Sequence, residues 1–526
     1  MEKGAAGSGE GASGGAPAGS TGGSTGGPSA GSSTAPYAGP SAGSPDAQRL
    51  FVGGEWVAPV GGHYAVVDPA TEETVGWAPE ASRDQVHAAC AAAREAFGPW
   101  SRTPAGERAA ILSRAGDLIR SRLLPYAELA RAETGATTGV ARGMQVGVAA
   151  ARFRRYARVE PAEWAIEPQV NEAGPMGRAA VMGALAVRQP VGVVTCVTSY
   201  NNPWANPAGK IAPALAMGNT VVVKPAPQDP LSVYRMARAL EEAGVPRGVV
   251  NVVSGRSVEV GEAAVDSPDV DMVSFTGSTA VGQRIGEVCG RSMKRQLMEL
   301  GGKGAALVFE DADLGSAVAG IGTTFSFYSG QICTAPTRVL AQRGVYDRLV
   351  EQLAAYAGRL AVGDPREPGT VVGPVISAAH RDRVESYVEL GRKEGAVVAA
   401  GGERPGLERG FYVTPTLLAD CRSDMRVVRE EIFGPVVTVT PFDDEEEGIA
   451  LAGDSDYGLI DYVWSADVAR AFRVARRLRA GGVGINTVGR NMEAPFGGFR
   501  RSGVGRDCGS YALHAYSEVQ SIVWPG

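Results

Sequence analysis

The sequence has few histidines, and its cysteines follow no regular pattern. Only four histidines occur among 526 residues, which disfavours a catalytic pair of serine or cysteine with histidine. The cysteines form no C-x-x-C pair and have no ligand-like histidine nearby; they are Cys90, Cys196, Cys289, Cys333, Cys421 and Cys508. This pattern argues against a metal site and against a disulfide framework, and it favours a reducing cytoplasm.

Long apolar runs and a strong excess of one charge are also missing. No apolar run approaches the roughly 18 residues of a membrane span, and the start, Met1 to Ala6, lacks the apolar stretch of a secretory signal. A formal net charge of −6 gives no electrostatic reason to expect nucleic acid. We therefore expect a cytoplasmic protein without a membrane or nucleic-acid partner.

Residues 1–46 consist mainly of Gly, Ser, Ala, Pro and Thr. Such a segment cannot bury enough apolar surface to offset its ordering entropy, so we expect a disordered tail. The pattern from Leu50 to Trp56 is that of a strand and a turn, and it marks the start of the folded part.

The rest of the chain has the pattern of an α/β protein. Residues 82–158 have helical periodicity, and after Val187 short apolar strands alternate with helices. The predicted strands are 191–197, 221–223, 249–253, 270–275 and 305–309, and the predicted helices are 207–217, 231–243 and 314–326. Alternation at this length predicts parallel sheets covered on both faces. A second α/β domain should follow Lys303, with Glu299 and Cys333 near the seam, where catalytic clefts often lie.

Glu299 and Cys333 lie in unusual local contexts. Glu299 is followed by Leu300-Gly301-Gly302-Lys303, and Cys333 is preceded by Gly330-Gln331-Ile332. Glycines permit close approach of backbone to a ligand, and a thiol is a strong nucleophile only as thiolate, so it needs a proton-accepting partner. A single cysteine is more often a buried structural residue. The paired contexts favour the nucleophile.

A phosphate-binding turn is expected after the strand 270–275. The chain contains no G-x-G-x-x-G here, but the strand runs into Thr276-Gly277-Ser278 and then a helix start. Free backbone amides at such a turn can bind phosphate, although many βα turns look alike. Lys224, at the end of an earlier strand, could reach a ribose or phosphate; a solvated surface lysine is the alternative.

Together these motifs resemble the aldehyde dehydrogenase superfamily from about Leu50 to the C-terminus. The matching runs, in order, are 199–203 (Ser-Tyr-Asn-Asn-Pro), 213–220, Lys224-Pro225, 275–278, 299–303, 330–333, 431–435 (Glu-Ile-Phe-Gly-Pro) and 495–498 (Pro-Phe-Gly-Gly). The resemblance implies a Rossmann-like cofactor domain (47–170 and 191–301), an α/β catalytic domain (302–498) and a β-hairpin oligomerisation arm (171–190 and 510–526). It also implies a homodimer or homotetramer, because exposed strands of this kind need a partner.

The resemblance further implies a reaction, the oxidation of an aldehyde to a carboxylic acid with NAD(P)+. Cys333 would be the nucleophile that forms a thiohemiacetal and then a thioester. Asn201 and the Cys333 N–H would hold the oxyanion, and Glu299 would be the base for thioester hydrolysis. The implied cofactor contacts are Lys224, Gly277, Ser278, Glu431 and Phe433, and no metal is expected.

Several residues depart from the family's pattern. Pro227 stands where many members have a glutamate that accepts the adenosine-ribose hydroxyls. NAD is expected because no added arginine is visible near Lys224, and NADP remains open. At substrate-tunnel positions that are often bulky and apolar, this chain has Asn202, Asn206 and Gly209.

Further residues bear on the expected substrate tunnel. Phe327 and Phe496 match aromatic tunnel positions, whereas Arg490 and Asn491 lie on the preceding loop. These two could contact a polar or anionic substrate tail, or could point to solvent. A polar, wider tunnel is therefore expected.

Two other functions compete with this one. A CoA-acylating member of the fold would release an acyl-CoA, but such enzymes usually lack the residue equivalent to Glu299. A non-catalytic structural relative would tend to lose the nucleophile. Since Asn201, Glu299 and Cys333 are all present, the hydrolytic enzyme is favoured.

Overall fold

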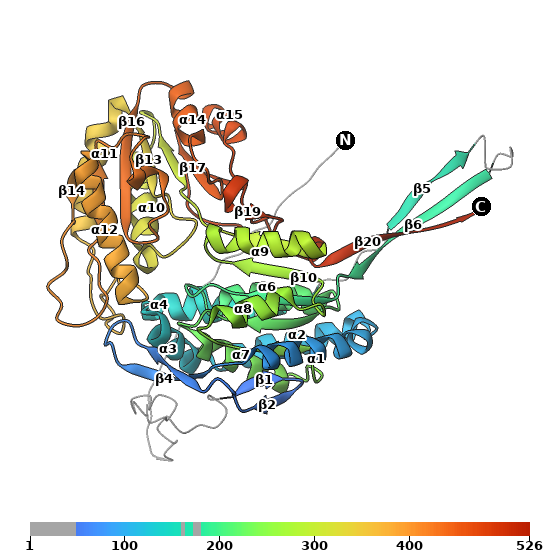
Figure 1. Cartoon of the computed structure of the whole chain (residues 1–526). Helices are drawn as coiled ribbons and strands as arrows, with labels where there is room; N and C mark the ends of the chain where they lie inside the picture. The colour runs from blue at the N-terminus through green and yellow to red at the C-terminus, as the bar shows by residue number, and fades with distance from the viewer. Residues whose placement is uncertain (1–48, 159–163, 172–179, 526) are drawn as a thin grey trace, which may run out of the picture. The chain divides into compact units, whose positions relative to one another are not determined.

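The computed structural model describes residues 49–158, 164–171 and 180–525 (Figure 1). The expected disordered tail, residues 1–46, lies outside the described residues. The described chain is built around two large sheets, and helices cover both faces of each sheet. The predicted α/β class with parallel sheets is confirmed.

The first sheet has eight strands in the order β19-β11-β10-β7-β8-β9-β1-β2. The strands are β1 Leu50–Val52, β2 Glu55–Val57, β7 Val193–Val197, β8 Thr220–Lys224, β9 Val250–Val252, β10 Met272–Thr276, β11 Arg295–Glu299 and β19 Gly503–Val504. The five central strands β7 to β11 run parallel, whereas β1, β2 and β19 add antiparallel edges. The sequence predicted the strands β7 to β10, and a strand followed by a turn in the region of β1 and β2.

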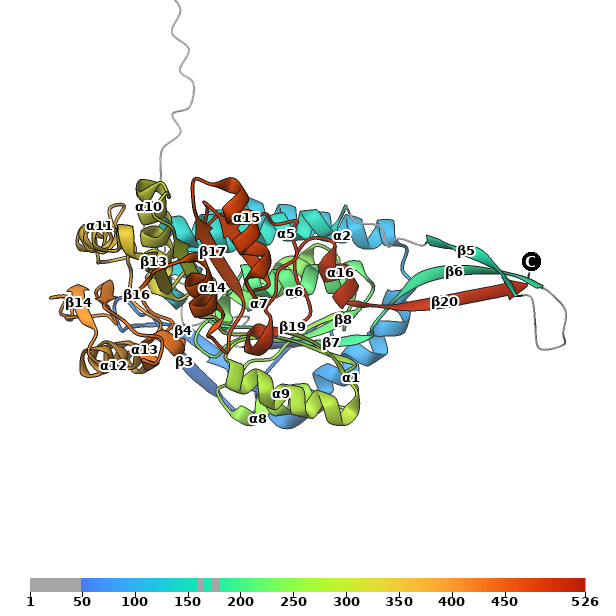
Figure 2. The same cartoon turned by 90° about the horizontal axis from the view of Figure 1, so that it is seen from above.

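Helices lie on both faces of this sheet, as Figure 2 shows from above. On one face α1, α8 and α9 contact one another, and on the other α2, α5, α6 and α7 do so. The helices of this region are α1 Arg83–Ser101, α2 Ala105–Ser121, α3 Leu123–Thr134, α4 Thr138–Val140, the π-helix η2 Ala141–Gly147, α5 Val148–Tyr156, α6 Ala205–Ala216, α7 Pro230–Glu242, α8 Val258–Asp266 and α9 Thr279–Ser292. The helical character predicted for 82–158 is confirmed.

Helix α1 illustrates how the sequence specifies these elements. Ser82 and Gln85 form a capping box, in which each side chain accepts a hydrogen bond from the other's backbone N–H. Val86, Ala89 and Ala93 then recur at helical spacing and are buried against the sheet.

The second sheet has seven strands in the order β14-β15-β16-β13-β12-β17-β18. The strands are β12 Ala305–Val308, β13 Arg338–Gln342, β14 Val397–Ala400, β15 Thr416–Ala419, β16 Val436–Phe442, β17 Ile460–Trp464 and β18 Gly482–Ile485. All pairs are parallel except β14 with β15. Ala306 and Val308 pack into one core and Ala305 and Leu307 into another, so both faces of the sheet are buried.

The helices around the second sheet follow the same alternation. They are α10 Leu314–Ser326, α11 Tyr346–Gly358, α12 Ala378–Glu394, α13 Arg426–Arg429, α14 Glu445–Gly453 and α15 Val468–Arg477. Helix α10 has the bounds that the sequence predicted. The remaining short elements are the 3₁₀ turns η3 Phe327–Gly330, η4 Arg343–Val345 and η5 Arg500–Ser502, and the helix α16 Tyr511–Ala515.

Two smaller sheets complete the fold. The strands β3 His63–Val67 and β4 Thr74–Pro79 form a hairpin. The strands β5 Trp164–Asn171, β6 Ala180–Pro190 and β20 Ser517–Pro525 form an antiparallel sheet in the order β20-β6-β5. This sheet contains parts of the predicted arm, 171–190 and 510–526, of which residues 172–179 and 526 lie outside the described residues. The domain boundaries given above remain predictions.

No helix in the described ranges is long and apolar enough to cross a membrane.

Candidate active site

The strands of the first sheet end at one edge and bring several predicted site residues there. Val197, at the end of β7, is in register with Lys224 of β8 and with Phe275 of β10. Thr276 is in register with Glu299, the last residue of β11. Asn201 and the turn 277–278 follow β7 and β10 directly. In open parallel sheets ligands bind outside the carboxyl ends of the strands, so this edge is the natural place for a site.

The segment 300–304 joins this edge to the second sheet, and its glycines allow close packing. A Cβ at Gly302 would lie 2.4 Å from the Cys333 carbonyl oxygen, and one at Gly301 would lie 2.2 Å from Glu431 Oε2. The Gly302 N–H donates to Glu431 Oε1 over 2.9 Å. The glycines that follow Glu299 therefore bring Cys333 and Glu431 against the same short segment.

The loop before Cys333 has an unusual backbone. Tyr328, Ser329 and Gly330 have φ angles of 51°, 56° and 70°, in the left-handed region that non-glycine residues rarely adopt. A Cβ at Gly330 would lie 2.2 Å from the carbonyl carbon of Gly434. The loop therefore packs tightly against the segment that carries Glu431. This contact holds the left-handed backbone of the loop in place.

Asn201 lies beside the Cys333 loop. Its Nδ2 donates to the carbonyl oxygen of Gln331 over 2.7 Å, and Ser199 Oγ donates to its Oδ1 over 2.8 Å. The buried Gln145 donates to the Asn201 carbonyl oxygen over 2.9 Å. Both ends of the amide are thus fixed two residues from the thiol, and the second Nδ2 hydrogen remains for a ligand.

The surroundings of Cys333 disfavour its thiolate. Burial raises the pKa of the Cys333 thiol to about 12, and the negative charges of Glu431 and Glu299 act in the same direction. The positive charge of Arg490 opposes them. In this state the thiol is protonated at neutral pH, so reaction as a nucleophile requires a proton acceptor.

Glu299 is a buried carboxyl group whose two oxygens have no hydrogen-bond partner among the described residues. Burial is the main cause that raises its pKa well above the usual value, and Asp507 adds to the effect, whereas Lys210 opposes it. A Cβ at Gly497 would lie 2.9 Å from Glu299 Oε1, so the 495–498 run passes beside this carboxyl. Raised pKa values and unpartnered oxygens suit a group that exchanges protons.

Lys210 and Asp507 are charged residues near the site that the sequence did not indicate. Lys210 Nζ donates to Ser274 Oγ over 3.0 Å inside the protein, and burial lowers the pKa of the lysine. The charges of Asp507 and Glu299 act against that lowering. One signal was present, because Lys210 is the single charged residue in the apolar helix α6.

The turn predicted to bind phosphate caps helix α9, but its Gly277 N–H is not free. Ser278 is the N-cap of α9, and its Oγ accepts from the Val281 N–H over 3.4 Å. The Gly277 N–H pairs with the Glu299 carbonyl oxygen over 3.1 Å. Lys224 is partly buried at the same edge, where burial lowers its pKa to about 8. The N-terminus of a 14-residue helix is a place where a phosphate can bind, and Lys224 lies two strands away, at the end of β8.

Glu431 and Phe433 lie on the opposite side of the seam. Burial raises the pKa of Glu431 to about 7, and the Gly302 N–H opposes this. Phe433 has a φ of 62°, and its ring meets that of Tyr200 edge-on at 5.9 Å. His380 Nε2 lies 2.8 Å from the Phe433 carbonyl oxygen. A carboxylate beside aromatic rings fits a ribose with an attached ring.

The expected substrate residues from α6 and the Cys333 loop are polar or adjacent to the thiol. Asn202 Oδ1 accepts from Gln145 Nε2 over 2.9 Å. Asn206 Oδ1 is buried and has no partner in the described parts of the chain. Phe327 begins η3, directly before the left-handed residues. The polar lining expected for the substrate tunnel stays a prediction.

Arg490 does not simply point to solvent. Its guanidinium lies 3.9 Å from the centre of the Phe496 ring, a cation–π distance. Its charge also acts on the pKa values of Cys333 and Glu299. Arg490 and Asn491 are both exposed, and Arg490 packs on the half-buried Phe496.

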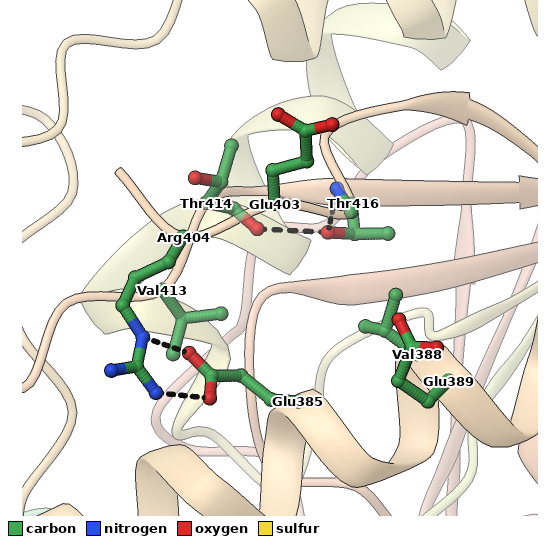
Figure 3. A pocket seen from close by; sticks show the side chains of 9 residues that line it. Glu385, Val388, Glu389, Glu403, Arg404, Val413, Thr414 and Thr416 are labelled. Carbon is green, nitrogen blue, oxygen red and sulfur yellow. Dashed lines mark hydrogen bonds and ion pairs between the residues drawn. The ribbon is translucent and has the colours of Figure 1, made fainter. Parts of the chain in front are cut away.

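A separate hollow of about 250 Å³ lies over α12 and the strands β14 and β15. Figure 3 shows Arg404 paired with Glu385 and the Thr416 hydroxyl bonded to the Thr414 carbonyl oxygen. Glu389, which also lines the hollow, pairs with Arg392 outside the lining, and none of the expected site residues lines it. The hollow therefore offers no chemistry of its own.

Comparison with known proteins agrees with this arrangement. The model of the aldehyde dehydrogenase family matches residues 56–522. The chain is 38% identical over 483 residues to betaine aldehyde dehydrogenase of Bacillus subtilis (strain 168), covering 90% of this chain and 97% of that one. It is 40% identical over 480 residues to geranial dehydrogenase of Castellaniella defragrans, covering 91% and 98%.

A solved structure agrees as well. The NAD+ complex of aldehyde dehydrogenase from Bacillus cereus has a TM-score of 0.84 and 39% identity, covering 90% of this chain and 96% of that one. The chain belongs to the aldehyde dehydrogenase family, enzymes that oxidise an aldehyde to a carboxylic acid with a nicotinamide nucleotide as hydride acceptor.

Proposed function

We propose that Cys333, Asn201 and Glu299 carry out the hydrolytic oxidation of an aldehyde to its acid, with NAD+ as the preferred cofactor. The observation that supports this most strongly is the convergence of the three residues. Asn201 is bonded to the Cys333 loop, the segment after Glu299 packs on the Cys333 carbonyl, and the charge of Glu299 acts on the thiol. They come from three separate parts of the sequence.

Cys333 first releases its proton to solvent water, and its sulfur then adds to the aldehyde carbon, so that a C–S bond forms as the carbonyl double bond becomes an oxyanion. Asn201 Nδ2 and the Cys333 N–H are the donors for that oxyanion. Loss of hydride converts the adduct to a thioester on Cys333. Glu299 then takes a proton from water as the water oxygen attacks the thioester carbon, and the acid leaves as the sulfur regains a proton. The unpartnered oxygens of Glu299 are free to bind that water.

When bound, NAD+ would supply the hydride acceptor. Gly277 and Ser278 at the start of α9 would hold the diphosphate, Glu431 and Phe433 the nicotinamide ribose, and Lys224 the adenosine ribose. Pro227 brings no carboxylate to that ribose, but the charge of Glu80 acts on Lys224. A negative charge there disfavours the 2′-phosphate of NADP+, which supports NAD+.

The two competing functions make different demands on the site. A CoA-acylating enzyme does not need a base that activates water. A binding protein does not need a thiol next to an amide donor. The unpartnered Glu299 and the fixed Asn201 favour hydrolysis over both.

A panel of aldehydes assayed with NAD+ or NADP+, with and without CoA, tests the proposal. We expect reduced cofactor to form, faster with NAD+, with free acid as the product and no stimulation by CoA. An acyl-CoA product would replace the hydrolytic function by the acylating one. Absence of reduced cofactor with every aldehyde would favour a non-catalytic protein.

We also propose a homodimer or homotetramer in the cytoplasm. On β20, Val519, Ile522 and Val523 are 46–56% exposed, as are apolar residues of the same sheet on β5 and β6. Strands of this kind are an aggregation hazard unless a partner covers them. All six cysteines are free, which suits a reducing compartment. A light-scattering mass of one subunit with full activity would contradict the assembly.

A further inference from the structure

Two arginines from distant parts of the chain meet at one sulfur beside the candidate centre. Arg152 lies on α5, and its Nη2 is 3.9 Å from Cys508 Sγ. Arg490 lies on the loop before Phe496, and its Nη2 is 3.8 Å from the same sulfur. Cys508 is buried with a φ of 63°, and its own N–H is bonded to Asp507 Oδ1 over 2.7 Å. Both guanidinium groups thus face one small region.

Gly209 makes room for one of them. A Cβ at this position would lie 2.2 Å from Arg152 Nη1 and 3.1 Å from its Cζ. Arg152 Nη1 donates to the Ala205 carbonyl oxygen on the same helix. A side chain at residue 209 would displace the guanidinium, so the small residue here and the arginine belong to one arrangement.

The loop that carries Arg490 is fastened to the helix that carries Arg152. Arg155, one turn after Arg152, forms a bidentate ion pair with Glu493, three residues after Arg490. A Cβ at Gly509 would lie 2.1 Å from the Glu493 carbonyl oxygen, so the loop also packs on the residue after Cys508. These contacts fix the two arginines relative to each other.

Neither Arg152 nor Arg490 forms an ion pair within the described ranges. Two buried carboxyls lie nearby: Glu299 has no hydrogen-bond partner among the described residues, and Asp507 Oδ1 accepts from the Cys508 N–H. Two like charges held side by side and partly out of water repel each other. A bound anion would relieve that repulsion, and a carboxylate matches the guanidinium fork.

The pair also lies close to the reaction. The charge of Arg490 acts on both Cys333 and Glu299, and that of Arg152 acts on Lys210. An anion held by the two arginines would therefore belong to the molecule whose other end reaches the thiol.

We propose that Arg152 and Arg490 bind a carboxylate at the far end of the substrate, so that the preferred substrates are semialdehydes of dicarboxylic acids. The inference rests on the proposed function and specifies its substrate class. Arg152 and Arg490 are specificity-determining residues here and take no part in bond making.

The test compares semialdehydes of four to six carbons with unbranched alkanals of the same length. Wild-type enzyme should prefer the semialdehydes. R152M and R490M should each lower kcat/KM for semialdehydes roughly ten- to hundredfold, mainly through KM, because each loses a charge-assisted hydrogen bond. Values for the alkanals should change less than about threefold in R152M. In R490M they should fall less than the values for the semialdehydes, because the charge of Arg490 also acts on Cys333 and Glu299. The control is R154M, which removes a charge from the same helix at an exposed pair with Asp117; it should leave both substrates unchanged.

A second measurement does not depend on turnover. Glutarate should raise the melting temperature of wild-type protein and of R154M but not of R490M, whereas R490K should retain part of the effect. Wild-type enzyme that oxidises alkanals as efficiently as semialdehydes would overturn the substrate class while leaving the proposed function intact. Equal losses on both substrates in R152M and R490M would do the same. If no aldehyde is oxidised, both the proposed function and the proposed substrate class are wrong.

Discussion

Glu299 and Glu431 are carboxyl groups at one seam, and both raise the pKa of the same thiol. They differ in their hydrogen-bond partners. Glu431 accepts the Gly302 N–H, and its pKa is about 7. Glu299 has no partner in the described chain, and its pKa is raised well above the usual value.

The difference separates two uses of a buried acid. A carboxylate fixed by a backbone N–H has a defined direction and suits the hydroxyls of a ribose. An unpartnered carboxyl with a raised pKa can take up and release a proton without breaking a bond to the protein. The comparison predicts that the two residues fail in different ways when they are changed.

The largest effect should come from the thiol between them. Cys333→Ala should reduce turnover of every aldehyde by about four orders of magnitude or more, because the covalent step has no substitute. Binding of NAD+, measured by calorimetry, should persist. Substantial remaining turnover would show that the two carboxyls surround some other nucleophile.

Glu299→Gln should separate the two halves of the reaction. The amide cannot accept the proton of water, so one equivalent of reduced cofactor should appear in a burst and steady turnover should fall by roughly two to four decades. Rapid-mixing absorbance of the reduced cofactor measures both phases. An unchanged steady rate would assign water activation to another group.

Glu431→Gln should act on the cofactor instead. Loss of a charged acceptor should weaken NAD+ binding about tenfold or more, with hydrolysis of the thioester little changed. The neighbouring Glu430→Gln, which removes an exposed pair with Arg426, is the control and should bind NAD+ normally. If Glu431→Gln instead produced a burst, the contrast with Glu299 would be wrong.

The smallest effect concerns pH. Glu299 works as a base only when ionised, so deacylation should increase as pH rises through its pKa. Because the charge of Asp507 raises that pKa, Asp507→Asn should move this limb of the rate profile to lower pH, by less than about one unit. A shift toward higher pH would reverse the assigned interaction.

Local patterns in the sequence indicated much of the fold. Short valine-rich runs predicted the strands β7 to β10, and the apolar periodicity of α10 predicted both of its ends. The strand β11 was missed because Arg295-Gln296-Leu297-Met298-Glu299 has no continuous apolar run. Its place is set by its parallel neighbour β10 and by β19, which lies about 200 residues later.

The candidate site also contains residues that local sequence patterns indicated and residues that they did not. Glycines beside Glu299 and Cys333 are local signals, and the structure brings those residues and Asn201 together, although their catalytic roles remain proposals. Arg152 and Asp507 gave no such signal, since each matters only through partners elsewhere in the chain. Lys210 stood out only as the single charged residue of the apolar helix α6. The sequence alone does not distinguish Arg152 from any other arginine on a helix surface. Only the structure places it beside Gly209 and Cys508.

The pairing of β11 with β19 has a consequence for the order in which the enzyme is made. Gly503 pairs with Glu299, Gly497 packs on its carboxyl, and β20 pairs with β6 only through the last residues of the chain. Chains are synthesised from the N-terminus, and long-range pairings form late. A growing chain that already contains Cys333 therefore lacks these contacts until residues 497–525 have been synthesised and have paired with the earlier strands.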